Sequence, residues 1–306
     1  MRPSEKGLRG GWLALAGAVA LLVVAPACSA TGVAADVPDP GGSDADAVPA
    51  AETGDSADRD VALLDTAGDA ADVPAAPTDC GWAWGEMVTI PAGVAIIGED
   101  CTRCDLWEAH RRPAHPVTVA AFAIDTVPVT NEAFAAFLDV VGERCGERCL
   151  NYAPKGPPDL TRDDIDDLRV PGKERLPVVW VTWVGARAFC ESHGRRLCSE
   201  VEWEVAALGY DGRIWPWGDE PPGPTRGNCG SPCGWPYRER VAVGCFPEGA
   251  APSGALDMVG NTAELVEDDW HESYDGAPAT GAPWIDEPRA HSRTFRGTGL
   301  LPESYP

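Results

Sequence analysis

The sequence predicts a domain of short strands and short helices joined by long irregular segments, preceded by a disordered tether. Three observations support this prediction. Segments rich in β-branched and aromatic residues lie at 87–97 and 117–124, as is typical of strands. Apolar residues with helical spacing follow capping residues further along the chain. The 34 Gly and 29 Pro residues favour turns and loops over long regular elements.

The first predicted elements are strands at Met87–Ile97 and Val117–Ile124, and Pro91-Ala92-Gly93 interrupts the first of them. A helix is predicted after Thr130, because the residues that follow place one apolar face at helical spacing: Phe134, Phe137, Leu138 and Val141. A second helix is predicted from Trp183, capped by Thr182 and stopped near Gly194.

A third helix is predicted to start at Ser199 and to end near Gly209. Ser199 and Glu202 have the spacing of a capping box, in which each side chain satisfies a backbone N–H at the helix start. Glu200 and Glu204 are four residues apart, so they share one face of this helix and could act as an acid/base pair. The alternative is that both carboxylates are structural and pack against loops.

The first 27 residues are predicted to be a secretory signal peptide. Basic residues precede an apolar run of fourteen residues, Trp12–Ala25, which is shorter than a membrane-spanning helix. The Ala-Pro-Ala-Cys that follows resembles a bacterial lipoprotein box, in which the Cys is cleaved and acylated. Cys28 is the predicted lipidation site, with ordinary signal cleavage as the alternative. The lipid would anchor an exported protein to a membrane of the cell envelope, facing the periplasm or the surface.

Residues 28–79 are predicted to be an acidic disordered linker. Between Ser29 and Asp79 the chain holds eleven Asp, one Glu and one Arg, with almost no aromatic residues. Low hydrophobicity and like-charge repulsion leave such a segment unable to offset the entropy cost of ordering. The whole chain carries a net charge of -24. An acidic surface repels phosphate backbones, so no nucleic-acid partner is expected.

The chain has eleven cysteines. If Cys28 carries lipid, the remaining ten fit up to five disulfides in an exported protein. Cys190 and Cys198 flank a helix end and the next helix start, a separation that one bridge could close. Two other uses are zinc binding and redox chemistry. Cys101 and Cys104 could form half of a zinc site or a redox dithiol. Cys145 and Cys149 could form half of a zinc site.

Five motifs, in order, carry a resemblance to a known family. They are MVTIPAGVAIIG from Met87, VTVAAFAIDTVPVTNEAFAAFL from Val117, LPVVWVTWVGARAFC from Leu176, GRRLCSEVEWEVAA from Gly194 and WPWGD from Trp215. They resemble the sulfatase-modifying-factor, or formylglycine-generating enzyme, family. The resemblance implies one α+β domain at 80–306, with a C-type-lectin-like fold and little regular secondary structure, truncated at its C-terminal end.

The resemblance also implies a calcium site in the segment DMVGNTAE. In the family an Asn or Asp, two backbone carbonyls and a Glu bind calcium here, and they correspond to Asp257, Gly260, Thr262 and Glu264. Two carboxylates and two carbonyls are hard oxygen ligands, so structural calcium is the expected metal. The alternative is a turn in which the two carboxylates only accept backbone hydrogen bonds. Ala263 replaces the Trp that is usual in the family.

The catalytic end of the family is not matched. In the family's enzymes the motif Arg-Gly-Gly-Ser is followed by two cysteines that bind copper. These enzymes oxidise a substrate Cys to formylglycine. Here Gly299 replaces the Ser, Pro302 stands at the first Cys, and no Cys follows. Soft thiolates hold Cu(I), so the sequence as written predicts neither copper nor catalytic residues.

Two functions follow from these patterns. The first is a membrane-tethered, exported pseudoenzyme that serves as a non-catalytic binding or structural module for a protein or glycan ligand. The second is a formylglycine-generating oxidoreductase of sulfatase maturation whose catalytic C-terminus is missing from this sequence. An oxidase of different chemistry, as in the pigment-biosynthesis relatives of the superfamily, is a third possibility. The eleven Trp residues from Trp82 onward could line a sugar groove or belong to the core.

Overall fold

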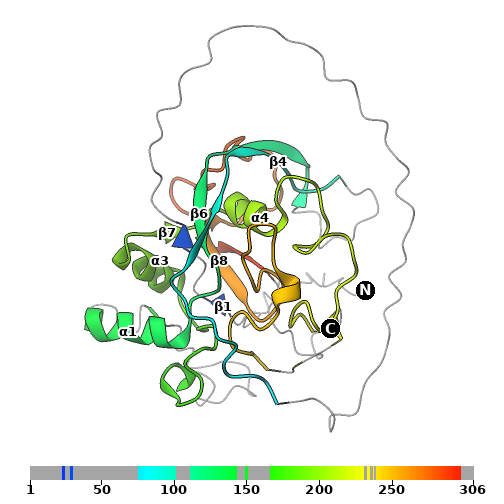
Figure 1. The fold of residues 1–306 in the computed structure, drawn as a ribbon. Helices are drawn as coiled ribbons and strands as arrows, with labels where there is room; N and C mark the ends of the chain where they lie inside the picture. Colours follow the sequence, from blue (N-terminus) through cyan, green and yellow to red (C-terminus); the bar gives the residue numbers. More distant parts are fainter. Residues whose placement is uncertain are drawn as a thin grey trace, which may run out of the picture.

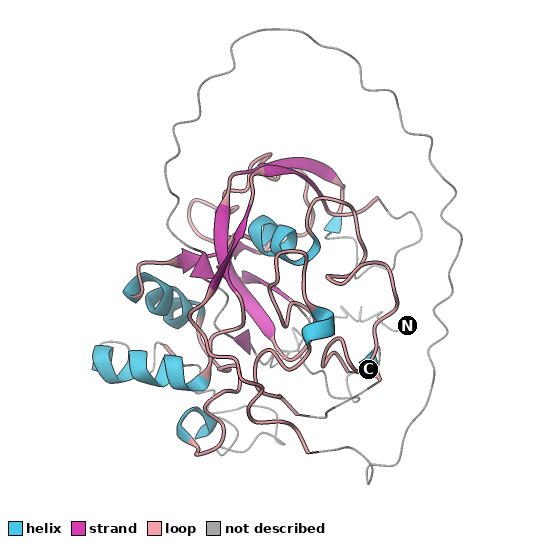
Figure 2. Ribbon diagram, viewed as in Figure 1, coloured by secondary structure: helices cyan, strands magenta, loops and turns pink. Residues whose placement is uncertain are grey.

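Short strands and helices alternate with long loops in the computed structural model, which confirms the predicted mixture (Figures 1 and 2). No helix in the described part of the chain is long and apolar enough to cross a membrane. Most of the predicted signal peptide and linker, as well as Cys101, Cys104 and Cys145, lie outside the described residues. The structure describes residues 23–24, 28–29, 75–100, 111–142, 149–150, 166–230, 233–234, 237 and 239–297.

Each of the two predicted strands is divided into two short strands. Strand β3 (Met87–Ile90) pairs antiparallel with β6 (Phe122–Asp125), and β4 (Gly93–Ile97) pairs antiparallel with β5 (His115–Val119). Pro91 lies at the first break, where the missing N–H stops the ladder. Gly93 follows it, and a Cβ there would lie 2.7 Å from the Tyr210 ring, so only Gly allows this close packing.

The three predicted helices are confirmed together with their caps. The Thr130, Thr182 and Ser199 side chains each accept a hydrogen bond from a backbone N–H of the first turn. Both hydrogen bonds of the predicted capping box are present, and the third helix ends at Gly209. A 3-10 turn, η4 (Asp166–Arg169), lies between the first two helices and another, η6 (Pro247–Gly249), follows the third. The helices are α1 (Asn131–Val141), α3 (Trp183–Ser192) and α4 (Glu200–Leu208).

A second sheet, which the sequence did not reveal, is built around β8 (Ala263–Asp269). It pairs antiparallel with β9 (Arg293–Arg296), and its other edge pairs in parallel with β1 (Val23–Val24). Six of the seven β8 residues are buried, so the strand lacks the alternating pattern that identifies a half-exposed strand. A separate two-stranded pair joins β7 (Arg196–Leu197) to β2 (Cys28–Ser29).

Two large groups of buried side chains hold these elements together. The first joins α1 to α3, where the Phe134 and Phe189 rings stack with centroids 5.5 Å apart. The second packs α4, through Trp203 and Ala206, against the β3 to β6 strands. Figure 1 shows α4 beside these strands and α1 and α3 together on another side of the molecule. Because α4 also contacts β8 and β9, its N-terminal end lies beside the second sheet.

The structure confirms that the chain forms disulfides, but one predicted pairing is wrong. Cys80 bonds to Cys245 and Cys229 to Cys233. Cys149 and Cys190 are also disulfide-bonded, so Cys149 is not a zinc thiolate. Cys198 is a buried thiol, and the predicted bridge between Cys190 and Cys198 is wrong. The physical reason is packing: Cys190 lies in the α1–α3 group, whereas Cys198 lies in the α4 group.

Candidate functional site

A partly buried arginine on β9, Arg296, is the centre of the site. Nε of Arg296 lies 3.2 Å from Oε1 of Glu200, and its Nη2 contacts the carboxylate of Glu204. Burial alone would lower the pKa of Arg296, but the adjacent Glu204 and Glu200 carboxylates outweigh it and raise the pKa. The two glutamates that could act as an acid/base pair thus share one guanidinium, which supports the structural alternative for them.

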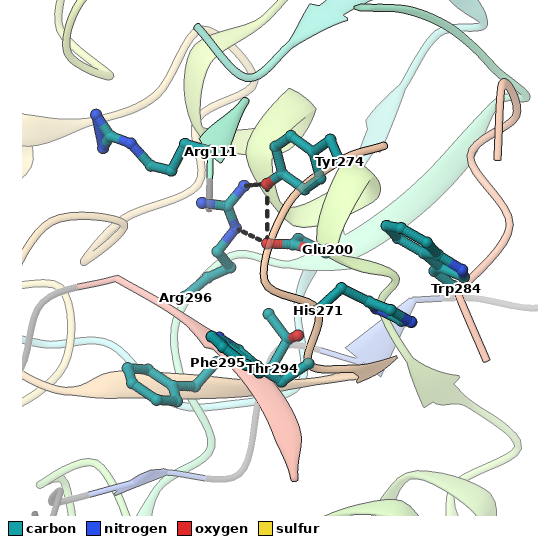
Figure 3. Close-up of a pocket in the computed structure, with 9 residues that line it drawn as sticks. Arg111, Glu200, His271, Tyr274, Trp284, Thr294, Phe295 and Arg296 are labelled. Atoms are coloured by element: carbon teal, nitrogen blue, oxygen red, sulfur yellow. Dashed lines mark hydrogen bonds and ion pairs between the residues drawn. The ribbon is translucent and has the colours of Figure 1, made fainter. Parts of the chain in front are cut away.

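Tyr274 closes this network. Its hydroxyl donates to Oε1 of Glu200 at 3.1 Å and accepts from Nη2 of Arg296 at 3.3 Å. Figure 3 shows the three side chains converging, while the Arg111 guanidinium points away from them. Burial is the main reason that the pKa of Tyr274 is raised. The phenol therefore remains protonated at neutral pH and keeps its role as a donor to Glu200.

Asp268 on β8 links the network to the loop that precedes β9. Its Oδ2 accepts from the backbone N–H of Glu200 at 2.8 Å, and its Oδ1 accepts from the N–H of Trp284 at 2.8 Å. Burial raises the pKa of Asp268 to about 7, although these two N–H groups oppose the shift. The Asp268 side chain therefore holds both the N-terminus of α4 and the loop that contains Trp284 against strand β8.

A cavity of about 160 Å³ lies against this network (Figure 3). Its wall is largely aromatic: Trp270 and Phe295 are 43% and 40% exposed. The His271 ring stacks on Trp284 with centroids 3.6 Å apart, and His271 Nε2 lies 3.2 Å from Asp286 Oδ1. The remaining lining residues are polar: Arg111, Glu200, Tyr274, Thr294 and Arg296. Apolar faces beside a few oriented polar groups are typical of a ligand site.

Three of the four residues predicted to bind calcium lie on the turn that leads into β8, and the fourth, Glu264, lies at the start of that strand. Asp257 is buried, and its Oδ2 accepts from the N–H of Gly244 at 2.7 Å. Glu264 is also buried and accepts from Nε1 of Trp203 at 3.1 Å. The carbonyl of Gly260 accepts from the N–H of Thr262 at 2.6 Å. Each carboxylate thus has a hydrogen-bond donor, as the alternative of a plain turn requires.

One oxygen in this turn nevertheless fits a cation. Oδ1 of Asp257 is buried and has no hydrogen-bond partner in the described structure, and burial raises the pKa of this carboxyl to about 6. A buried acceptor without a donor is costly unless something neutralises it. No group of three or more His, Cys, Asp or Glu side chains suited to a metal occurs among the described residues, so carbonyl oxygens would have to complete the site.

Gly260 gives the turn its shape. Its φ is +84°, and a Cβ there would lie 2.5 Å from the carbonyl of Asn228. Gly260 and Asn228 form a parallel bridge, which holds the 228 segment against the turn. The side chain of Asn228 adds a second buried oxygen, Oδ1, without a partner in the described structure.

Sequence reasoning found Glu200 and Glu204 but missed the aromatic wall. Trp270, His271 and Trp284 come from the end of β8 and the loop after it, and no local periodicity joins them to α4. The one signal was the concentration of Trp in the domain, which the sequence could not divide between core and groove. The β8–β9 pairing, with Leu265 opposite Phe295, is what places Phe295 and Arg296 beside this loop.

Residues 73–303 match the family model described as the sulfatase-modifying factor enzyme 1-like domain. The chain belongs to the sulfatase-modifying-factor family. The site therefore lies within a sulfatase-modifying-factor domain, and the α+β fold expected from the resemblance is confirmed. A solved structure of similar fold is that of PvdO from Pseudomonas aeruginosa, with a TM-score of 0.57 and 26% identity over 73% of this chain and 85% of that one.

The curated relatives of this domain differ in activity. Hercynine oxygenase of Mycolicibacterium smegmatis is 32% identical over 59% of this chain and 45% of its own length. The formylglycine-generating enzyme of Mycobacterium tuberculosis is 31% identical over 62% of this chain and 76% of its own. The inactive C-alpha-formylglycine-generating enzyme 2 of Bos taurus is 30% identical over 65% of this chain and 76% of its own length. The chain thus spans less than half of the oxygenase, and the family includes enzymes and an inactive member.

Proposed function

We propose that this chain is an exported, lipid-anchored pseudoenzyme: a sulfatase-modifying-factor domain that binds a protein or glycan ligand without catalysis. The pocket beside Arg296 carries this proposal. In the family the residues after this Arg-Gly lead to the copper cysteines. Here Arg296 forms ion pairs with Glu200 and Glu204 and a hydrogen bond with Tyr274, at the wall of an aromatic pocket. Pro302 stands at the position of the first copper cysteine.

The described cysteines support a structural rather than a catalytic use. Two pairs are joined in disulfides, Cys80–Cys245 and Cys229–Cys233. The thiol of Cys198 has a pKa raised well above its usual value, first by burial and then by the nearby Glu202. A thiol held protonated in the core is a poor nucleophile and a poor copper ligand. The disulfides also support the proposal that the protein is exported, because disulfides persist outside the reducing cytosol.

Calcium is part of the proposal as a structural metal. Asp257, Gly260, Thr262 and Glu264 would hold it, and the unpartnered Oδ1 of Asp257 is the observation that supports it. The ion would supply the charge that this buried carboxylate lacks. We also propose that the domain has a C-type-lectin-like fold.

The membrane tether follows from the sequence of the first 79 residues. Acylation at Cys28 would place the lipid some fifty residues before the domain in the sequence. In space Cys28 lies on β2, which pairs with β7, so the lipid would lie beside the domain. Cleavage before Cys28 would remove β1 but keep β2. Mass spectrometry of the mature chain from host membranes tests this: the expected N-terminus is an acylated Cys28. An unmodified chain in the soluble fraction would contradict the anchor.

Absence of oxidase activity is tested directly. The purified domain, loaded with Cu(I) and supplied with oxygen, is incubated with a Cys-x-Pro-x-Arg peptide. The expected result is an unchanged peptide mass, with an active formylglycine-generating enzyme as the positive control. Formation of a peptide aldehyde would overturn the non-catalytic function and favour the oxidoreductase alternative.

A further inference from the structure

We propose that the outer edge of β4 pairs with β4 of a second copy of this chain, so that two domains share one continuous antiparallel sheet. Three features of the strand support this inference. Its outer edge has unpaired backbone groups, its exposed face is apolar, and its sequence is complementary to itself in an antiparallel pair.

Strand β4 lies at the edge of its sheet. Among the described strands it pairs with β5 alone. The other side of β5 is occupied, because the N–H of Thr118 donates to the carbonyl of Ala279 at 3.0 Å and the carbonyl of Thr118 accepts from the N–H of Gly281 at 2.9 Å. Figure 1 shows β4 at the top of the domain. An edge strand of this kind offers a row of N–H and C=O groups to a further strand.

The outward backbone groups of β4 belong to Val94 and Ile96. Val94 lies opposite Thr118, whose N–H and C=O both point to the other side of β5. Ile96 lies opposite Pro116, which has no N–H to donate. Because hydrogen-bonded and non-hydrogen-bonded pairs alternate in an antiparallel ladder, the N–H and C=O of Val94 and Ile96 point away from β5. No hydrogen bond to these groups occurs among the described residues.

The exposed face of β4 is apolar. Val94 is 60% and Ile96 is 65% exposed, and the residues opposite them on β5, Thr118 and Pro116, are exposed and uncharged. Natural edge strands are usually guarded by a charged residue, a proline or a bulge. The sequence of β4, Gly-Val-Ala-Ile-Ile, contains neither a charge nor a proline, and its register with β5 is unbroken.

Charge favours a second copy at this face. The chain has a net charge of -24, so two copies repel each other where their acidic surfaces meet. A face without charged residues avoids this repulsion. The apolar edge of β4 is such a face, and it lies on a strand whose backbone groups are ready to pair.

A two-fold axis through Ala95, perpendicular to the sheet, gives a self-complementary register. It places Val94 opposite Ile96 of the second copy, and the reverse, so each pair exchanges two N–H···O bonds and joins two β-branched side chains. The acidic residues after the strand do not meet, because Glu99 lies opposite Pro91 of the second copy. The two copies of Ala95 face each other with Cα atoms about 4.5 Å apart.

Sedimentation velocity of the full mature chain in detergent, over a range of concentrations, tests the dimer. One five-residue strand from each copy buries less area than a standard interface, so we expect a reversible dimer that dissociates on dilution. Val94→Lys/Ile96→Lys should weaken it by about tenfold or more, because this double variant removes two β-branched pairs and sets like charges opposite each other. Val140→Lys, at a residue 82% exposed on α1, should leave the dimer unchanged.

Oxidation with diamide tests the register. Ala95→Cys should form a disulfide-linked dimer, since the Cα separation across the axis suits a disulfide. Thr118→Cys lies one strand further from the axis and should not form this link, and the wild type controls for native thiols such as Cys198. If Ala95→Cys does not fold, an equal mixture of Val94→Cys and Ile96→Cys chains tests the same register.

Each other outcome has a defined meaning. A monomer at every concentration overturns the inference, as does a dimer that the double lysine variant leaves intact. A dimer that the lysines weaken but that Ala95→Cys does not cross-link overturns the pairing of the strands. A monomer that binds a fluorescent peptide of the sequence Gly93–Ile97, and loses it in the double variant, would assign the edge to a partner strand instead of a second copy. Thermal melting shows that each variant is folded.

Discussion

Nε of Arg296 and Oε1 of Glu200 lie 3.2 Å apart although 95 residues separate them in the sequence. The contact joins the end of β9 to the first residue of α4, and Glu204, one turn later, binds the same guanidinium. A single cation thus joins two partly buried carboxylates, balances one of their two negative charges and fixes one wall of the pocket. This arrangement leads to the first prediction.

Arg296→Met should destabilise the domain by about 3 kcal/mol, because it leaves two carboxylates without their cation. Urea unfolding at pH 7 measures the change. Arg296→Lys keeps the charge and should cost less, and the triple variant with Glu200→Gln and Glu204→Gln should recover part of the loss. A change below about 1 kcal/mol in Arg296→Met would mean that the network contributes little.

Stability should fall as the pH rises from about 4 to 7. In the folded protein the pKa of Asp257 is raised to about 6 and that of Asp268 to about 7, from 3.8. Between these values the folded state keeps protons that the unfolded chain has released, so unfolding becomes easier as pH rises. The contribution of Asp257 is about 3 kcal/mol. Urea titrations in chelator should show this slope, and Asp257→Asn should reduce it. A flat profile would contradict both shifts.

Calcium should stabilise the domain through Asp257. At a concentration one hundred times its Kd, a single ion adds about 2.7 kcal/mol, and chelator should remove this gain. Asp257→Asn and Glu264→Gln should abolish the calcium-dependent rise in melting temperature, whereas Asp211→Asn, an exposed carboxylate paired with Arg213, should leave it unchanged. An identical melting temperature with calcium and with chelator would favour the plain turn.

The two described disulfides should contribute unequally. Cys80 and Cys245 are 165 residues apart, whereas Cys229 and Cys233 are four apart. In the loop-entropy model the long bridge contributes about 5 kcal/mol and the short one about 2 kcal/mol. Unfolding of the Cys80→Ser/Cys245→Ser and Cys229→Ser/Cys233→Ser variants tests this order. Equal losses would show that enthalpy or unfolded-state structure dominates.

Local signals predicted the helices because each depends on residues a few positions apart. Thr130, Thr182 and Ser199 cap helices through N–H groups three residues later, and sequence spacing alone reveals such bonds. Strand β8 was missed because it is buried on both faces and carries Glu264, Asp268 and Asp269 in the interior. Acidic residues in a strand are satisfied only by distant partners, such as Trp203 for Glu264 and Arg289 for Asp269.

The sequence by itself determined the family, the cap of each helix and the candidate calcium turn, since these depend on residue types at short, ordered spacings. The tertiary structure alone decided that Glu200 and Glu204 meet Arg296, that Cys198 remains a thiol, and that Trp270 and Phe295 share a pocket wall. The physical reason is that these relationships depend on the pairing of β8 with β9 and the packing of α4 beside them. Such contacts join residues far apart in the chain and leave no periodic trace in it.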